Sequence, residues 1–370
     1  MSAPELGSEN DDERFMALAL RLGCRGLGRT WPNPAVGAVV VKNGIVAGRG
    51  WTQPGGRPHA EIEALRRAGA AARGATLYVT LEPCSHHGKS PPCVDAIVSA
   101  GVMRVVSALV DPNPKVAGAG HWKLAEQGVL VEVGMGAEEA RHAHAGHIRR
   151  MRDARPHVAV KLAVSADHKV ALADRRPAEI TGEAARRRAH LMRGKSDALL
   201  TGIGTVLADD PELTCRLPGV PTPVRVLLDC NLRLPLSCRL LGTARVSPIW
   251  VFTGERASTE RQKLLAARGL EPIRVPEKNG KLDLFAVLTL LAERGITRLM
   301  LEAGPLLTSA FLAADLVDEA ALFRSPRFIG PEGIDALDGL PLSALTQSPR
   351  LRQVGSEVLG EDVLDTFERV

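Results

Sequence analysis

The residues best suited to chemistry are a histidine, a glutamate and two cysteines in the first hundred positions. His59 stands two residues before Glu61, and Cys84 and Cys93 follow farther along the chain. An imidazole and two thiolates are zinc ligands, and three protein ligands leave the fourth position of a tetrahedral zinc open, as in catalytic sites. A carboxylate beside such a site can move protons. The sequence therefore predicts a catalytic zinc centre with Glu61 as its acid-base group.

The order of these residues is that of the His-x-Glu…Pro-Cys-x-x-Cys motif of zinc deaminases, here with the second half stretched to Cys-x8-Cys. This motif predicts replacement of an aromatic amine by oxygen. Two simpler interpretations exist. His59 could cap a helix while the cysteines are small buried residues, or His86 or His87 could close a structural four-ligand zinc site. Finding both halves of the motif in order favours the catalytic interpretation.

The elements that must position these residues alternate between strands and helices, which predicts a sheet covered by helices. A helix is expected to start near His59, and Cys93 follows a Pro-Pro pair that suits another helix start. The positive end of a helix favours thiolates and carboxylates. The predicted helices cover 13–27, 117–127 and 137–150 besides these two, and the predicted strands cover 36–42, 45–50, 75–81, 103–110 and 129–133.

The second half repeats this rhythm after the polar segment 149–156, where we place the domain boundary. Glycines follow two of its predicted strands, in the loop 201–211 and at Gly304, where backbone N–H groups could meet a dinucleotide pyrophosphate. Neither segment has the Rossmann glycine fingerprint, and a simple turn is the alternative. Predicted strands cover 157–165, 198–202, 224–229, 249–253, 271–275, 298–302 and 318–323, and predicted helices cover 182–194, 258–268, 283–294 and 305–314.

Length and composition limit the classes of protein. A chain of 370 residues favours two globular domains, and 45% hydrophobic residues can build both cores. Aromatic residues are only 3% and the net charge of +5 is dispersed, which disfavours nucleic-acid binding and favours a small anionic substrate. No apolar run predicts a membrane span or a signal peptide, and the six cysteines fit a reducing cytoplasm. Residues 1–12 are expected to form a disordered tail, and His142, His144 and His147 to be solvated.

Five segments resemble the family of bifunctional riboflavin-biosynthesis deaminase–reductases: 31–37, 58–61, 81–88, 91–93 and 111–114. The resemblance runs from about residue 13 to the C-terminus. It implies an α/β chain with a cytidine-deaminase-like domain at 13–152 and a dihydrofolate-reductase-like domain at 157–370. It also implies zinc-dependent hydrolytic deamination of a diaminopyrimidinone ribosyl 5'-phosphate, followed by NADPH-dependent reduction of its ribose to ribityl.

The resemblance also implies roles for individual residues. His59, Cys84 and Cys93 would hold zinc, and Glu61 would donate the proton. The expected substrate contacts are Asn33, His86, Lys89, Asp111 and Asn113 in the deaminase, and Lys161, Arg193, Leu213, Arg216 and Glu302 in the reductase. The expected cofactor positions are Thr181, Thr205, Asp209, Gly304, Pro305, Leu306, Leu307, Thr308, Ser309 and Ala310. For the residues beside prolines, Asn33, Asp111 and Asn113, turn formation is the alternative role.

The chain departs from the family pattern in two places in its second half. His168 stands where the family commonly has glycine in a Ser-x-Asp-Gly-Lys segment, and 177–179 replace a Ser-x-Trp. These changes remove a hydroxyl and an aromatic wall from the expected reductase site. The alternatives to the family's two reactions are a nucleic-acid editing deaminase, a noncatalytic zinc module, and a reductase-like domain that only binds ligand. A homo-oligomer is compatible with the sequence.

Overall fold

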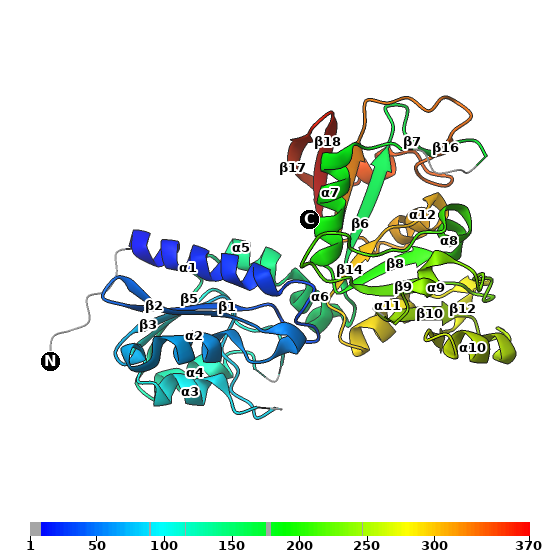
Figure 1. Ribbon diagram of the computed structural model, residues 1–370. Helices are drawn as coiled ribbons and strands as arrows, with labels where there is room; N and C mark the ends of the chain where they lie inside the picture. Colours follow the sequence, from blue (N-terminus) through cyan, green and yellow to red (C-terminus); the bar gives the residue numbers. More distant parts are fainter. Residues whose placement is uncertain (1–8, 89, 115, 175–178, 246) are drawn as a thin grey trace. The chain divides into compact units, whose positions relative to one another are not determined.

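The chain divides into two units, with the division between Ala154 and Arg155 (Figure 1). The computed structural model describes residues 9–88, 90–114, 116–174, 179–245 and 247–370. Across these residues, no helix combines the length and the apolar character needed to cross a bilayer. Each unit is built around its own sheet, and the two are described separately below.

The first unit contains a five-stranded sheet within the described residues, in the order β2-β1-β3-β4-β5. The strands β1 and β2 form a hairpin that turns at Asn43-Gly44, and β3, β4 and β5 run parallel to one another. The strand bounds are Gly37–Lys42 for β1, Ile45–Trp51 for β2, Thr76–Val79 for β3, Arg104–Ser107 for β4 and Leu130–Val133 for β5.

Helices cover both faces of this sheet because its strands carry apolar side chains on both. Successive side chains of a strand point to opposite faces, and here both sets are apolar. Val39 and Val41 pack against α1, whereas Ala38 and Val40 face α2. Figure 1 shows α1 and α5 on one face and α2, α3 and α4 on the other. The helices are α1 Glu9–Gly23, α2 Ala60–Ala68, α3 Cys93–Ser99, α4 Ala119–Glu126, α5 Ala137–Ala143 and α6 Ala145–Asp153, with 3-10 turns at Cys24–Gly26, Pro54–Gly56 and Gly69–Ala72.

The expectation of a tail over 1–12 is wrong for residues 9–12, which form the start of α1; residues 1–8 lie outside the described part of the chain. The physical reason is a buried ion pair. Both carboxylate oxygens of Asp12 accept from the Arg104 guanidinium of β4, at 3.0 and 2.5 Å, and the Tyr78 hydroxyl also donates to Asp12. These contacts tie the first turn of α1 to the sheet.

The expectation that His144 and His147 are solvated is also wrong, although His142 is exposed. The predicted helix 137–150 is interrupted at His144, so that α6 begins anew after this residue. His144 and His147 then face inward and keep only 2% and 6% of their surface exposed. Nε2 of His144 lies 3.0 Å from the Thr80 hydroxyl, which also accepts from the Gly37 N–H.

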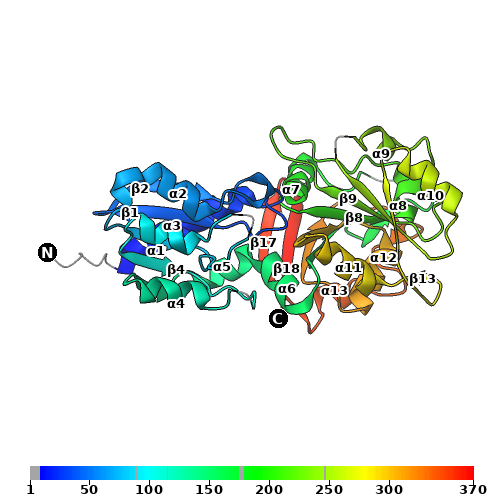
Figure 2. The ribbon, with the colours of Figure 1, turned by 90° about the horizontal axis from the view of Figure 1, so that it is seen from below.

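The second unit contains a nine-stranded sheet, as far as the structure describes it, in the order β11-β10-β9-β8-β14-β6-β15-β18-β17. The strands from β11 to β15 are parallel, and β18 and β17 add an antiparallel hairpin at one end (Figure 2). The bounds are β6 His157–Val164, β8 Ala198–Gly202, β9 Val224–Leu228, β10 Ile249–Thr253, β11 Glu271–Arg274, β14 Arg298–Leu301, β15 Glu319–Arg324, β17 Leu351–Leu359 and β18 Asp362–Arg369.

Apolar side chains from the parallel strands pack against α8, α9 and α10 in one cluster, and α7 packs against β15 and β18 in another. The helices are α7 Glu183–Gly194, α8 Ile203–Asp209, α9 Arg239–Gly242, α10 Thr259–Ala266, α11 Leu284–Glu293, α12 Pro305–Ala313 and α13 Ser343–Thr346. Two short strand pairs complete the unit: β7 Lys169–Ala171 with β16 Ile334–Asp335, and β12 Glu277–Lys278 with β13 Lys281–Leu282.

The segment 201–211, expected to be a loop, instead contains the helix α8. Gly202 has extended dihedral angles and starts the helix directly after β8, and Asp210 ends it in the left-handed region at φ 40°. An immediate strand-to-helix junction needs no loop residues. The N-terminus of α8 therefore lies at the carboxyl end of β8, where ligands of parallel sheets bind.

Candidate active sites

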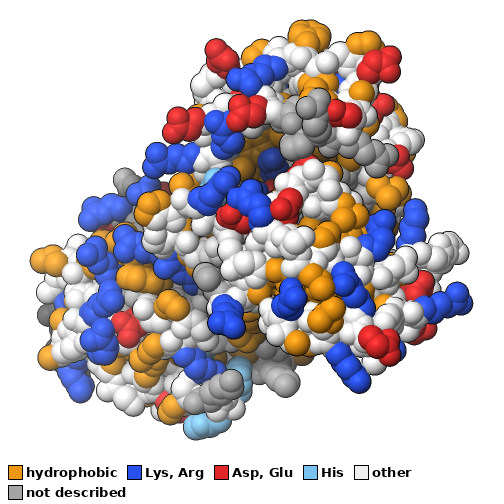
Figure 3. All heavy atoms as spheres, turned by 45° about the vertical axis from the view of Figure 1, so that its right-hand side comes forward, with side chains coloured by type: hydrophobic (Ala, Val, Ile, Leu, Met, Phe, Trp, Pro, Cys, Tyr) orange, Lys and Arg blue, Asp and Glu red, His pale blue; other side chains and the backbone are white. Residues whose placement is uncertain are grey.

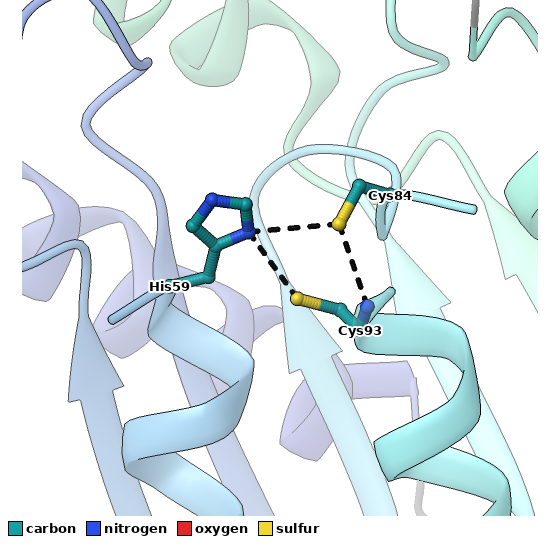
Figure 4. A group of neighbouring side chains, drawn as sticks. All are labelled: His59, Cys84 and Cys93. Atoms are coloured by element: carbon teal, nitrogen blue, oxygen red, sulfur yellow. Dashed lines mark hydrogen bonds between the residues drawn. The ribbon is translucent and has the colours of Figure 1, made fainter. Parts of the chain in front are cut away.

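The three predicted zinc ligands converge on one point in the first unit (Figure 4). Nδ1 of His59 lies 3.6 Å from Sγ of Cys84 and 3.3 Å from Sγ of Cys93. With Zn–N and Zn–S bonds of ordinary length, the edge of a tetrahedral site between nitrogen and sulfur is about 3.6 Å. The spacing of the donor atoms thus fits a zinc ion held by one imidazole and two sulfurs.

Two of the three ligands lie at the starts of helices. His59 is the N-cap of α2, Cys93 is the first residue of α3, and Cys84 follows the end of β3. The backbone N–H of Cys93 points at Sγ of Cys84 at 3.4 Å. This contact and the positive end of α3 favour negative charge on sulfur, the form that binds metal.

The hydrogen bond from the Cys93 thiol, followed by that from His59, lowers the pKa of Cys84 to about 4 despite its burial. The same bond to Cys84, with burial, raises the pKa of Cys93 well above its usual value. The hydrogen bond to Cys84 raises the pKa of His59. These opposite shifts favour the negative charge on the sulfur of Cys84, the form in which a cysteine binds metal.

Glu61 lies in the first turn of α2 and only 4% of its surface is exposed. Burial raises the pKa of this carboxyl, and its neighbours include the Cys93 thiol. A raised pKa makes the protonated carboxyl more accessible, which suits a general acid-base group. Its position and environment suit the predicted proton transfer.

Two glycines allow close packing around His59: Gly50 against the backbone of α2, and Gly56 against the side chain of Asn33. A Cβ on Gly50 would lie 2.3 Å from the Ala60 carbonyl, so α2 can pack on β2 only at a glycine. Gly56 has φ of +83°, and its Cβ would clash with Asn33. Nδ2 of Asn33 donates to the Gly56 carbonyl at 2.8 Å and lies 3.5 Å from Nε2 of His59. Asn33 thus lies beside the metal centre.

A buried carboxylate that the sequence analysis did not single out organises the other side of the site. Glu82, two residues before Cys84, accepts from the N–H groups of Asp111, Gly118 and Gly120 at 3.0, 2.9 and 2.8 Å. These bonds fix the loop after β4 against the strand that leads to the metal. The only hint in the sequence was its place beside Pro83-Cys84, since its partners are backbone groups far along the chain.

The other residues predicted to contact the substrate of the deaminase lie in different environments. His86 is exposed in the loop between the cysteines, and Lys89 lies outside the described residues. Asp111 is buried, and its Oδ1 accepts from the Asn113 N–H at 2.8 Å. This is the turn expected as the alternative role for Asp111. Asn113 is half-buried in the same turn.

In the second unit, three predicted substrate residues form one charged cluster. Nε and Nη2 of Arg193 on α7 each bond one oxygen of Glu302 at 2.7 Å. Burial lowers the pKa of Lys161 on β6, and Glu302 partly offsets this effect. For Glu302, burial raises the pKa but Arg193 and Lys161 lower it below its usual value. The cluster forms because Glu302 directly follows β14, the strand that pairs with β6.

The other two predicted substrate residues lie on the segment after α8. Leu213 is buried at φ +56°, an unusual conformation for a bulky side chain. Nη1 of Arg193 donates to the next carbonyl, that of Thr214, at 2.9 Å. Nε of the exposed Arg216 lies 3.3 Å from Nε2 of His190, a residue that the sequence analysis missed. Arg193 thus links this segment to Glu302.

The predicted cofactor positions are only partly brought together. The Thr205 hydroxyl of α8 accepts from the Gly304 N–H at 3.2 Å, so the N-termini of α8 and α12 lie side by side. In α12, Thr308 and Ser309 are buried and their hydroxyls bond Ala303 and Asp338. Thr181 precedes α7, Asp209 ends α8, and Pro305, Leu306, Leu307 and Ala310 belong to α12. Paired helix N-termini fit the phosphates of a dinucleotide.

Fold and site together define a zinc deaminase domain followed by a reductase domain. Residues 9–109 match the cytidine and deoxycytidylate deaminase zinc-binding region, and residues 156–364 match the RibD C-terminal domain. The riboflavin biosynthesis protein RibD of Escherichia coli (strain K12) is 41% identical over 360 residues, which cover 95% of this chain and 98% of that protein. The chain belongs to the RibD family, the bifunctional deaminase–reductases of riboflavin biosynthesis.

Other relatives agree along the whole length. RibD of Aquifex aeolicus (strain VF5) is 40% identical, covering 97% of this chain and 98% of that protein. A solved structure of Acinetobacter baumannii RibD superposes with a TM-score of 0.86 at 36% identity, covering 98% of this chain and 99% of that chain. A Thermotoga maritima diaminohydroxyphosphoribosylaminopyrimidine deaminase/5-amino-6-(5-phosphoribosylamino)uracil reductase gives 0.85 at 35%, with coverage of 98% and 99%. The predicted fold class and family are confirmed.

Proposed function

We propose that the first unit deaminates a 2,5-diamino-6-ribosylamino-pyrimidinone 5'-phosphate and that the second reduces the ribose of the product to a ribityl chain. The observation that carries this proposal is the convergence of His59, Cys84 and Cys93 beside the buried carboxyl of Glu61. Three metal ligands with an adjacent acid-base group are the minimum for hydrolytic deamination of a heterocycle.

In the deaminase site the protein residues hold the ring and move protons. Zinc, when bound by the three ligands, supplies a Lewis acid that activates water at neutral pH. Glu61 takes a proton from the water and returns it to the amine nitrogen, so that ammonia leaves and oxygen replaces it. Asn33, which lies against the imidazole of His59, and Asp111 and Asn113, in the loop after β4, are the expected contacts for the ring.

In the reductase site the buried charges hold the sugar phosphate. NADPH, when bound at the N-termini of α8 and α12, supplies the hydride for the sugar carbon. Arg193 is held by Glu302 in a fixed orientation, and Lys161 lies near the same carboxylate. Arg216, supported by His190, offers a second guanidinium that can bind phosphate oxygens in a fork.

We further propose a small-molecule substrate, not nucleic acid, and a cytoplasmic location. Lys and Arg side chains on the face in Figure 3 are interspersed with acidic and apolar ones. Aromatic residues, which stack single-stranded bases, make up only 3% of the chain. Neither feature favours an editing deaminase.

The test supplies purified, zinc-loaded protein with the diaminopyrimidinone ribosyl phosphate. The expected result is one equivalent of ammonia released without NADPH, followed by oxidation of one equivalent of NADPH when it is added. Mass spectrometry should then show a ribityl product. No ammonia release from this compound, with release from single-stranded DNA or tRNA instead, would overturn the proposal.

A further inference from the structure

A buried histidine of α6 holds one of the expected substrate-contacting carboxylates. Nε2 of His147 lies 2.8 Å from Oδ1 of Asp111, and only 6% and 8% of the two residues' surfaces are exposed. A carboxylate oxygen can only accept here, so Nε2 of His147 carries the proton and donates it. This pair joins the last helix of the first unit to the loop after β4.

The contact fixes the direction of the Asp111 side chain as well as its place. Oδ1 accepts from both the His147 imidazole and the Asn113 N–H, whereas Oδ2 of Asp111 has no hydrogen-bond partner within the described part of the chain. The backbone of Asp111 is held separately, because its N–H donates to Glu82. Glu82 thus positions the main chain of the loop, and His147 positions the carboxylate.

We infer that His147 is a positioning residue of the deaminase, which locks Oδ1 of Asp111 and leaves Oδ2 to accept from an amino group of the pyrimidine. The inference rests on the proposed deaminase function, in which Asp111 contacts the substrate. Without the imidazole, the carboxylate could turn about its χ angles and present either oxygen, so that substrate binding would weaken. A binding group that is already oriented before the substrate arrives increases the affinity for that substrate, because no ordering cost is left to offset the contact.

The test compares steady-state deaminase kinetics of the full-length, zinc-loaded variants on the diaminopyrimidinone ribosyl phosphate. His147→Phe keeps the ring size but removes the donor, and should raise KM about tenfold with kcat changed less than about threefold. His147→Gln restores an N–H at a similar reach and should return KM to within about twofold of the unaltered protein. In an Asp111→Ala background, His147→Phe should add nothing further to KM.

His144→Phe is the matched control, since His144 is equally buried in the same region but contacts Thr80. It should leave KM unchanged. Zinc content, measured in the same preparations, reports that the first unit of each variant is folded. An unchanged KM in His147→Phe, failure of His147→Gln to rescue it, or a full effect in the Asp111→Ala background would overturn the inference. Absence of ammonia release by the unaltered protein would instead overturn the proposed function.

Discussion

At the scale of single residues, the metal ligands could be read from the sequence because the chemistry needs few residue types at characteristic spacings. His59, Cys84 and Cys93 are such residues, and their donor atoms converge. Glu82 and His147 could not be recognised in the same way. Their partners are a set of backbone N–H groups and the carboxylate of Asp111, which only the folded chain brings to them.

The ion pair of Arg193 and Glu302 yields a prediction for the reductase. Arg193→Lys keeps the positive charge but loses the fork that bonds both oxygens of Glu302. The charge at this position is then no longer held in a fixed orientation. We expect KM for the deaminated ribosyl phosphate to rise about tenfold. Steady-state NADPH oxidation measures this, with ammonia release as the internal standard.

Arg187→Lys provides the matched control, because Arg187 is exposed on the same helix. It should leave both activities unchanged. Equal effects of the two substitutions on the reductase would show that the Arg193 fork has no special role, and so would a KM in Arg193→Lys that matches the unaltered protein.

At the scale of elements, the departure at His168 has a clear conformational consequence. The turn between β6 and β7 runs through 166–168, is closed by the Ser165 N–H that donates to the Lys169 carbonyl, and has His168 at φ +63°. A left-handed backbone is the conformation that glycine adopts most readily. A histidine at this position carries a conformational cost of about 1 kcal/mol.

We expect His168→Gly to raise the free energy of unfolding slightly, by about 0.5 kcal/mol, because relief of the left-handed strain is partly offset by greater freedom of the unfolded chain. His168→Val should lower it by about 1–2 kcal/mol, since a β-branched residue fits this region poorly. Denaturant unfolding measures both. A glycine variant less stable than the valine variant would contradict the conformational explanation.

The anchoring of α1 gives a second prediction at this scale. Asp12→Ala leaves Arg104 with Glu132 as its remaining carboxylate, and should lower the free energy of unfolding by about 3 kcal/mol. Asp11→Ala, at a neighbouring and more exposed carboxylate, should change it little. Thermal or denaturant unfolding distinguishes the two variants. Similar small effects of both substitutions would contradict a stabilising buried ion pair between Asp12 and Arg104.

The same pair predicts a pH dependence. Burial raises the pKa of Asp12, but the bonds from Arg104 and Tyr78 outweigh it and leave the pKa below its usual value of 3.8. A carboxyl with a lowered pKa in the folded state stabilises the protein above its unfolded-state pKa and loses this contribution as the pH falls. The difference in stability between the unaltered protein and Asp12→Asn should therefore shrink below about pH 4. A difference that grows on acidification would contradict it.

Most elements followed from hydrophobic periodicity, and the exceptions have physical causes. The strand β17 was not predicted because both its faces are largely exposed, so it shows no alternation of apolar and polar residues. Pairing with β18 is what defines it. The helix α8 was taken for a loop because Gly202 and Gly204 resemble turn residues, whereas Gly202 only starts the helix. The pairing of β17 with β18 and the direct junction of β8 with α8 depend on the rest of the fold, so the local sequence does not predict them.

At the scale of the whole molecule, each unit has its own apolar clusters, with those of the first unit drawn from residues before 155 and those of the second from residues after it. Removing zinc should therefore affect one activity only. We expect a chelator to abolish ammonia release while NADPH oxidation on the already deaminated compound persists, and added zinc to restore the first activity. Parallel loss of both activities would contradict separate sites.

Ammonia release by Glu61→Gln, in protein whose zinc content is determined at the same time, tests the catalytic zinc centre and its acid-base carboxyl together. The amide is similar in size to the carboxyl but cannot exchange protons with water and the leaving amine. We expect a full complement of zinc, a loss of ammonia release of about a thousandfold or more, and unchanged NADPH oxidation on the deaminated compound. Ammonia release at the unaltered rate, with zinc in place, would contradict it.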